Sequence, residues 1–392
     1  MKKEKVAIRS IWAEYFITGL TAFGGPVILK KLRKLAIDRG WLTEREFIDA
    51  LAMIQLYPGP TGFDMAAFTG YKLRGVPGAI TAGTAFILPA YLLILLLSYF
   101  YFTFGDLPFV EKLLIGLEAT VIGILFDLTL ELGQRSLRGV IQALIALFSF
   151  VALNYRVSAV LVVLLSLAAG ALLLSGRGPV ERDDTAIPER AGVRRWTAIG
   201  ITAAAVLGGT LAAFLSRTLM GEMGLVFFKI GAVAFGNGTT ILPLVSADVV
   251  DAHKWLTPRQ FADGIALGQV TPGPFLITAA FIGYKVGGVA GSLLSTFAIF
   301  SPSLVMTMAF TEVMHRVKRF GFARGALAGA MSCFVGLLSH MLAGLASIAL
   351  HSPATWCLAG LSFAAVRFFK LDTALVMACC LAAWSAISFF PF

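Results

Sequence analysis

The stretch WLTEREFIDALAMIQLYPGP, residues 41–60, returns downstream as WLTPRQFADGIALGQVTPGP, residues 255–274. Eleven of the twenty aligned positions are identical, at a constant offset of 214 residues. Chance would give roughly one or two identities, so the chain contains an internal duplication. Shorter matches extend the repeat: Phe23-Gly24 with Phe235-Gly236, Gly70-Tyr71-Lys72 with Gly283-Tyr284-Lys285, and Pro89 with Pro302. Helix-breaking Gly/Pro clusters at matching positions of two apolar halves are typical of secondary transporters.

The composition indicates a protein that is solvated by lipid. Of the 392 residues, 58% are hydrophobic and 14% are charged, and the mean hydropathy is +0.84. A soluble chain of this length would need more polar surface. The net charge of +10 comes mainly from Lys and Arg at the ends of apolar segments, where they set topology and snorkel. We therefore expect the bilayer as a partner and no nucleic acid. The polar N-terminus predicts no cleaved signal peptide.

Apolar runs of about spanning length predict an all-α, polytopic membrane protein. They lie at 78–104, 109–133, 138–154, 156–175, 196–216, 288–312, 323–350, 353–369 and 371–389. The predicted divisions are a first membrane repeat at 1–175, a polar linker at 176–195, an unpaired linking helix at 196–216 and a second membrane repeat at 217–392. The linker carries both charge signs and two prolines, which is typical of an exposed loop.

The basic loops predict that the two halves have opposite orientations. Lys72 and Arg74 precede the run at 78–104, and the loop after it carries Asp106 and Glu111, so this segment runs from inside to outside. In the second half the strongest basic loop, 315–319, follows the matching run. That run therefore goes from outside to inside. The sequence thus predicts two inverted-topology repeats, a scaffold for alternating access.

The duplicated block predicts a helix that is broken inside the membrane. In each copy a threonine begins a capping box, Thr43 with Glu46 and Thr257 with Gln260. The helix then runs about a dozen residues before the first proline of Pro-Gly-Pro ends it. Its length of roughly 18–20 Å is less than the ~30 Å of hydrocarbon. A second short helix follows, ending near Gly-Tyr-Lys. Each unit is therefore a broken helix or a re-entrant hairpin.

Backbone groups freed at such breaks must be buried in protein or line a pathway, because lipid cannot pair with them. The amides after Pro60 and Pro274 form positive helix ends that suit an anion. The glycine-rich segments 23–26 and 235–238 form a second pair of breaks. Two structural alternatives stay open. The Pro-Gly-Pro block can be a packed kink, and the glycines can serve helix packing.

The motifs Phe-Gly-Gly-Pro, Trp-Leu-Thr…Phe…Asp, Gln-x-x-Pro-Gly-Pro and Gly-Tyr-Lys together resemble the signatures of the chromate ion transporter family. Its long-chain members have two homologous halves, and the resemblance covers nearly the whole chain outside the linker. It implies a multi-pass inner-membrane protein that exports chromate and confers chromate resistance. Such a transporter would be secondary active and driven by the proton-motive force, as an antiporter. One departure is that Gly25-Pro26 becomes Asn237-Gly238, so the two anion-facing surfaces need not be equivalent.

Other functions stay open beside chromate export. A sulfate-like oxyanion importer or an anion exchanger is the main alternative. The expected protein partner is a second copy of the chain, in a homodimer. Transport direction and coupling ion are not fixed by the sequence. An enzyme would need a nucleophile, base or metal constellation, and none is visible, so we expect no enzyme, no metal and no cofactor. The absence of a Walker motif argues against ATP-driven pumping by this chain.

A tetrahedral oxyanion is best held by converging N–H donors in a site of low dielectric. Gln55 and Gln269 lie one turn before the breaks and can donate to it, although interhelical hydrogen bonding is their alternative role. Hydroxyl groups near the breaks add further donors. The predicted substrate-binding residues are Gly24, Gly25, Gln55, Pro58, Gly59, Pro60, Thr61, Gly236, Asn237, Thr239, Gln269, Pro272, Gly273 and Pro274.

Charged residues near the breaks have separate predicted roles. Lys72 and Lys285 would draw anions toward opposite mouths of the pathway, or would snorkel. Asp64, in the first turn after Pro60, is the candidate for proton coupling, with helix-dipole stabilisation as its alternative. Thr278 replaces it in the second half. Weaker candidates among the acids of apolar segments are Glu14, Glu118, Asp127 and Glu131.

Overall fold

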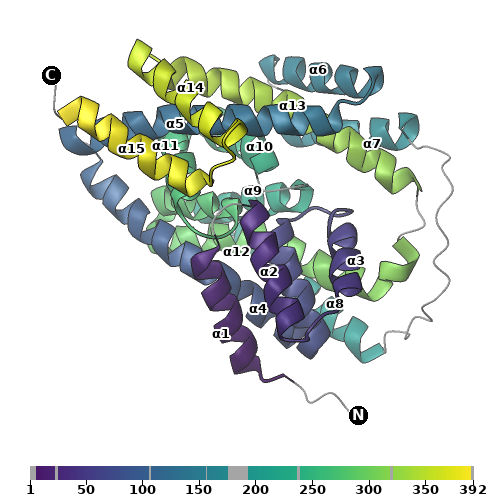
Figure 1. Ribbon diagram of the computed structural model, residues 1–392. Coiled ribbons are helices and arrows are strands. Elements are labelled where there is room, and N and C mark those ends of the chain that lie inside the picture. The colour runs from purple at the N-terminus through teal and green to yellow at the C-terminus, as the bar shows by residue number, and fades with distance from the viewer. Residues whose placement is uncertain are drawn as a thin grey trace.

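The computed structural model describes residues 6–22, 25–105, 107–155, 157–174, 193–235, 239–317 and 321–389. These described residues form helices and no strand (Figure 1). Five helical segments are long and apolar enough to cross a membrane: Thr61–Phe104, Pro108–Ser136, Arg194–Leu215, Phe275–Val313 and Arg324–Ala349. The prediction of an all-α, polytopic membrane protein is confirmed.

The helices of the two halves correspond in order. The first half contains α1 (Ile8–Thr21), α2 (Gly25–Asp38), α3 (Glu44–Ile54), α4 (Thr61–Phe104), α5 (Pro108–Ser136), α6 (Val140–Asn154) and α7 (Ala159–Leu173). The second contains α9 (Leu219–Val233), η1 (Thr239–Ile241), α10 (Leu242–Ser246), η2 (Ala247–Ala252), α11 (Pro258–Val270), η3 (Phe275–Ile277), α12 (Thr278–Val317), α13 (Gly321–Ala349), α14 (Pro353–Arg367) and α15 (Thr373–Phe389). Between them lies α8 (Val193–Leu215), at the place of the predicted unpaired helix. The predicted linker up to residue 192 lies outside the described residues.

The long element α4 consists of two helices that fold back on each other. Its backbone breaks at Gly75, where φ is +66°, a conformation that favours glycine. A Cβ on Gly70 would collide with the carbonyl of Gly78, and a Cβ on Gly78 with that of Gly70. Residues eight apart in one straight helix would lie about 12 Å from each other. The chain therefore reverses, and we call 61–73 the short arm and 76–104 the long arm of α4.

The matching element α12 reverses in the same way. Its backbone breaks at Gly288, where φ is +60°, and a Cβ on Gly283 would collide with the carbonyl of Gly291. The short arm of α12 is 278–286 and the long arm is 289–317. Both short arms end where the sequence predicts, beside the Gly-Tyr-Lys motif.

The short arm of α4 also runs antiparallel to α3, the helix before the Pro-Gly-Pro block. Glu46 in the first turn of α3 and Lys72 near the end of the short arm form an ion pair of 2.6 Å. In the second half, Gly264 of α11 lies against Phe281 of the short arm of α12. Each block is therefore the tip of a helical hairpin, which decides between the two shapes that the sequence allows.

The long arms of the two halves run in opposite directions. The Phe63 and Phe300 rings lie 4.9 Å apart, and the Tyr71 hydroxyl donates to Glu312 Oε1 over 2.6 Å. The short arm of α4 is thus parallel to the long arm of α12. Because the short arm is antiparallel to its own long arm, the long arms of α4 and α12 are antiparallel to each other.

The two halves are interlocked because helices of each half pack against helices of the other. A Cβ on Gly123 of α5 would collide with the carbonyl of Ala359 in α14. A Cβ on Gly336 of α13 would collide with the carbonyl of Ala146 in α6. Each half thus places its α5 or α13 against the other half, and α5, α13 and α14 lie along one side of the molecule in Figure 1. The core is shared by both repeats.

Candidate functional site

The two Pro-Gly-Pro tips meet the opposite half at equivalent places. The backbone N–H of Gly59 donates to the carbonyl of Ala234 over 2.7 Å, and that of Gly273 donates to the carbonyl of Ala22 over 2.8 Å. Ala22 and Ala234 directly precede the two Phe-Gly segments. The structure therefore brings each tip to the start of the glycine-rich break of the other half, where the sequence expects the breaks to meet.

Several of the predicted site residues lie outside the described residues or at their borders. Gly24, Gly236 and Asn237 lie outside the described residues. Gly25 is the first residue of α2, and Thr239 is the first residue of η1. The tips are thus described in full, while the glycine-rich segments are described only at their edges.

The amides of the tip glycines are already paired in this conformation, whereas the donors that the sequence predicts are the amides after Pro60 and Pro274. The unpaired donors of a helix are those of its first turn. In the short arm of α4 this turn begins at Thr61, which is buried, and the first helical bond runs from the Asp64 N–H to the Pro60 carbonyl over 3.0 Å. The positive helix end lies two to four residues beyond the glycine.

Asp64 lies in a buried polar cluster at the first tip. Its side chain is fully buried, and its Oδ1 accepts hydrogen bonds from the hydroxyls of Ser303 and Thr307, the latter at 3.2 Å. The Thr307 hydroxyl also lies 2.8 Å from the Tyr57 hydroxyl. Asp64 Oδ2 has no hydrogen-bond donor within the described parts of the chain. The cluster joins the first half, through Asp64 and Tyr57, to the long arm of α12.

Gly59 has a structural reason to be glycine. A Cβ at this position would collide with Asp64 Oδ2 and with the Ser303 hydroxyl. At the second tip, a Cβ on Gly273 would lie 3.0 Å from the Cβ of Ala90, and the φ of Gly273 is +105°. The tip of the first half is therefore shaped around a carboxylate, and the tip of the second half around a methyl group.

The two glutamines lie on the hairpins one turn before the tips. Gln55 is the C-cap of α3 and is exposed, and Gln269, near the end of α11, is half-buried. Neither side-chain amide has a hydrogen-bond partner among the residues that the structure describes. Within the described parts of the chain, interhelical hydrogen bonding therefore does not occupy them.

The two lysines lie at separate ends of the interface between the halves. Lys285 Nζ lies 5.1 Å from the centre of the Phe102 ring, which is a cation–π contact. Lys72 pairs with Glu46 over 2.6 Å. Partial burial raises the pKa of Glu46, but hydrogen bonds from Lys72 and Thr43 lower it more, so this pKa lies below its ordinary value. Glu46 thus stays ionised and neutralises much of the Lys72 charge.

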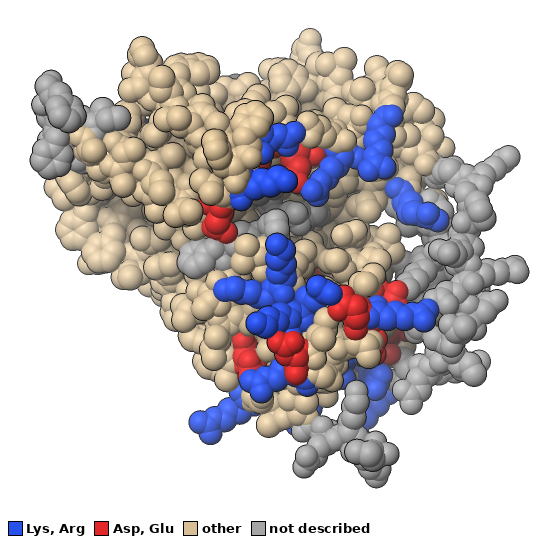
Figure 2. Space-filling view, in the orientation of Figure 1, with Lys and Arg blue, Asp and Glu red and all other residues tan. Residues whose placement is uncertain are grey.

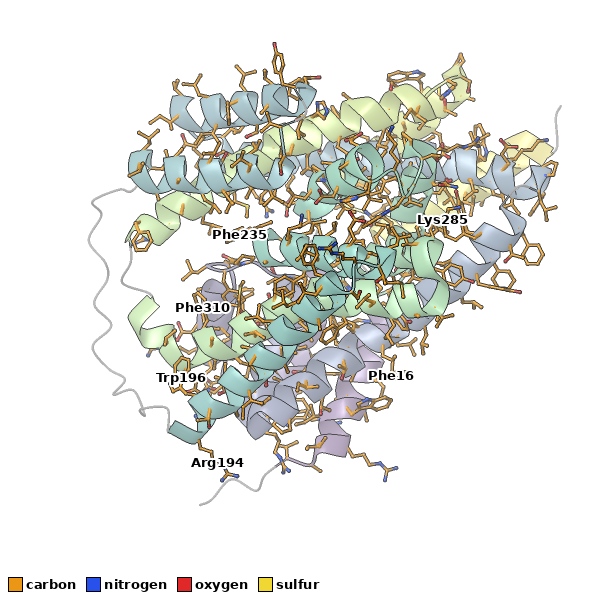
Figure 3. The ribbon with its side chains drawn as sticks, turned by 180° about the vertical axis from the view of Figure 1, so that it is seen from behind. Phe16, Arg194, Trp196, Phe235, Lys285 and Phe310 are labelled. Carbon is orange, nitrogen blue, oxygen red and sulfur yellow. The ribbon has the colours of Figure 1, made fainter. Side chains whose placement is uncertain are left out.

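Figure 3 shows Lys285 and Phe310, which belong to the two arms of α12, at well-separated places in the molecule. The Phe310 ring packs against Tyr57 with 4.8 Å between centroids, so it marks the end of the interface that carries the Asp64 cluster and Glu312. Lys285 marks the other end. Over α2 and α3, Figure 2 shows Lys and Arg gathered with acidic side chains among them, including the Arg33–Glu44 pair at 2.6 Å.

The four weaker acidic candidates each contact an arginine. Glu14 pairs with Arg39, Glu131 with Arg135 at 2.5 Å, Asp127 with Arg367 at 3.6 Å, and Glu118 with Arg259 at 3.2 Å. The first three are ion pairs with arginines that are 29–70% exposed. Glu118 is different because it is buried beside a second acid, Asp263.

Sequence reasoning did not single out the partners of Asp64. Ser303, Thr307 and Thr311 recur every four residues in an apolar helix, which places them on one face. That spacing was the available signal, since hydroxyl side chains on one face of a membrane helix often bond to a neighbouring helix. Nothing in the spacing says which helix or which side chain they contact.

The comparison with known proteins agrees with this arrangement. The family profile described as "Chromate transporter" matches residues 9–171 and again residues 221–384. The chain belongs to the chromate transporter family. The two matches are the two repeats, and they leave out the linker and all of α8. The chain is thus a two-repeat member of the chromate transporter family and a multi-pass membrane protein.

Curated relatives cover most of the chain. It is 30% identical over 368 residues to a chromate transport protein of Cupriavidus metallidurans, covering 93% of this chain and 89% of the relative. It is 29% identical over 343 residues to an uncharacterized transporter of Methanocaldococcus jannaschii, with coverages of 86% and 84%. An uncharacterized transporter of Bacillus subtilis, YwrB, matches 42% of this chain at 32% identity and is itself 86% covered. No solved structure matches the chain.

Proposed function

We propose that this chromate transporter family member is a secondary active transporter that exports chromate across the inner membrane in exchange for protons. The observation that carries the proposal is the first tip. There a fully buried carboxyl group, Asp64, lies at a helix start between the two halves. A proton-exchanging group and the positive helix end for an anion lie within one turn of each other.

The arrangement of the halves supports alternating access. Their matching long arms run in opposite directions, and their basic loops predict opposite orientations in the membrane. Repeats that are inverted about an axis in the membrane plane can open to either side by exchanging roles. The tips contact the other half through one backbone hydrogen bond each. A rocking motion of one half would therefore change the surroundings of both tips together.

The substrate site in this proposal lies between the tips. The first-turn amides of the short arms, beginning at Thr61, supply N–H donors at positive helix ends. Gln55 and Gln269 add donors from the helices before the tips, and Asn237 adds one from the glycine-rich break. Such a site holds a compact dianion without a full opposing charge that would trap it. Chromate is the proposed substrate because several relatives carry the name chromate transport protein.

The contacts of Asp64 suit a group that gains and loses a proton. All its described hydrogen bonds come from hydroxyls, and its Oδ2 is buried without a described donor. Burying an unpaired carboxylate costs several kcal/mol, about as much as the energy that an ion pair would return. A proton on Asp64 removes this cost.

The test is transport by purified protein in lipid vesicles. Chromate uptake into inside-out oriented vesicles should be driven by a proton gradient that is acidic inside, and Asp64→Asn should remove this dependence. Sulfate in excess serves as the competitor that identifies a broader oxyanion transporter. The proposal would be contradicted if chromate uptake by the parent protein depended on neither the proton gradient nor the membrane potential.

A further inference from the structure

A second buried acidic site lies at the other end of the interface between the halves. Asp263 of α11 is 1% exposed and Glu118 of α5 is 3% exposed. The Tyr101 hydroxyl, from the long arm of α4, donates to Asp263 Oδ2 over 2.6 Å. Asp263 Oδ1 is buried and has no donor among the described residues. The site thus contains an acceptor oxygen that is both enclosed and unpaired.

Burial raises the pKa of the Asp263 carboxyl, and the neighbouring Glu118 carboxylate raises it further. Since Tyr101 occupies Oδ2, Oδ1 is the oxygen left for Glu118. Two neighbouring ionised carboxylates repel each other, and a single proton between them converts the repulsion into a hydrogen bond. The geometry is that of an acid pair that shares one proton.

The charges around the two carboxyl groups also indicate one bound proton. Arg259 is the cation that contacts it, with Nε 3.2 Å from Glu118 and Nη1 3.1 Å from Glu111. Glu111 is 52% exposed and keeps much of its hydration. One arginine is therefore left to balance two buried carboxyl groups, and no other ion pair to them occurs among the described residues. A buried charge without a partner is strongly unfavourable, so one bound proton completes the site.

In the described parts of the other elements packed against α11, the acids are Glu312 of α12 and Asp64 of α4, which lie at the opposite end of the interface. From α12, Lys285 lies over the Phe102 ring, next to Tyr101. The helices α13 and α15 contain no Asp or Glu. The ionisable groups of α13 include Arg324 and His340, and the His340 ring lies 5.6 Å from that of Phe150 in α6.

We infer that Asp263 and Glu118 together bind one proton, and that this proton holds α11 against α4 and α5. The inference rests on the proposed function, which requires protons to enter from outside. The loop between α4 and α5, beside this site, is on the predicted outer side. Loss of the proton leaves adjacent carboxylates that repel across the interface and open it there. A proton taken up from outside closes that side after the oxyanion has left.

The duplication supplies a matched control within the same chain. Arg45 and Asp49 occupy the positions of Arg259 and Asp263 in the repeated block. The position that matches Glu118 in the second half is Met331, so the other repeat has a methionine there in place of an acid. Asp49→Asn is therefore the same substitution at a position whose counterpart of Glu118 is not acidic.

The experiment is an infrared pH titration of the full chain in lipid vesicles, with Asp64→Asn as the parent so that this carboxyl does not contribute. The parent should show a C=O band of a protonated carboxyl group at neutral pH that disappears at alkaline pH. Asp263→Asn and Glu118→Gln should each remove this band, and Asp49→Asn should leave it unchanged. Carbon-13 labelling of aspartate assigns the band if one variant does not fold.

A parent without such a band, or a band that survives both substitutions, would overturn the inference. Hydrogen exchange of α11, corrected for its intrinsic pH dependence, should become faster as the band disappears, and no coupling between the two would refute the closing role. None of these measurements needs chromate. A failed vesicle transport assay with an intact titration therefore removes the proposed function alone, and the reverse outcome removes only this proton site.

Discussion

The two Pro-Gly-Pro tips make equivalent backbone contacts and have different surroundings. Both glycines donate to an alanine carbonyl of the other half, at 2.7 and 2.8 Å. The first tip lies against Asp64, whose side chain accepts hydrogen bonds from hydroxyls of α12. At the second tip Thr278 takes the place of Asp64, and its hydroxyl donates to the Phe275 carbonyl over 3.0 Å. Ala90 stands where the first tip has Ser303. The two repeats therefore share the backbone contacts of the hairpin and differ in the side chains around its tip.

The largest expected effect is a change in the pH dependence of transport when the carboxylate at the first tip is replaced. Asp64→Asn keeps the size of the side chain and removes its ability to exchange a proton, so the pH dependence of chromate transport should become flat while chromate binding stays largely intact. Initial rates in vesicles across a pH series measure this. Thr278→Val, at the same place on the other tip, should keep the pH dependence of the parent. A normal pH dependence in Asp64→Asn would show that the tips do not differ in this respect.

The next effect tests whether the tips cooperate in binding. Gln269→Leu should remove a hydrogen bond to a charged ligand, which is worth about 1.5–3 kcal/mol or roughly a ten- to hundredfold change in affinity. Gln55→Leu should act in the same direction if the site is shared. Equilibrium binding of chromate to the purified variants measures both. If both variants bind as the parent does while Lys72→Gln abolishes binding, the site lies at the lysines instead.

A smaller effect distinguishes the tips by stability. Gly273→Ala forces a side chain into a left-handed conformation, at a cost of about 1–3 kcal/mol. Gly59→Ala should have a further consequence, because its methyl group must displace Asp64 or Ser303 and their hydrogen bond, worth about 1.5–3 kcal/mol. Thermal unfolding in detergent compares the two. Only Gly59→Ala should also alter the pH dependence of transport, and identical behaviour of both variants would remove the distinction.

The smallest effect is expected at the surface. Lys72 and Glu46 have side chains that are 36% and 43% exposed, and such ion pairs contribute about 0–1 kcal/mol. Lys72→Gln should therefore leave stability nearly unchanged and should lower the rate of chromate capture at low salt. Rates measured at increasing ionic strength should converge with those of the parent. A variant that is equally slow at high salt would show that Lys72 contacts the bound ion.

The hairpins were predictable because their signals are local. Both capping boxes are confirmed, with Thr43 N–H to Glu46 Oε2 at 2.8 Å and Thr257 N–H to Gln260 Oε1 at 3.1 Å. The prediction that proline ends each helix holds for α11, which ends at Val270 just before Thr271-Pro272, but α3 already ends at Ile54, four residues before Pro58. The repeat then showed that the hairpin occurs twice. The runs at 138–154, 156–175, 353–369 and 371–389, which were predicted to be of about spanning length, form helices of 15–17 residues.

The partners of the buried acids were not predictable for the opposite reason. Ser303 and Thr307 lie 239 and 243 residues from Asp64 in sequence, and Tyr101 lies 162 residues from Asp263. These contacts depend on how the two repeats exchange helices. One sequence gives the apolar face of each helix, but many pairings of such faces bury similar area. The interlocked arrangement therefore had to come from the structure.

The interlocking also sets the order in which this protein can be assembled. During synthesis, α5 enters the membrane before α14 exists, so the groove at Gly123 has no partner until more than half of the remaining chain has been made. The same holds for α6, which must wait for α13. The first repeat is thus an unfinished intermediate whose small-residue surfaces face lipid or an insertion factor, and native packing closes only after α13 and α14 have been made.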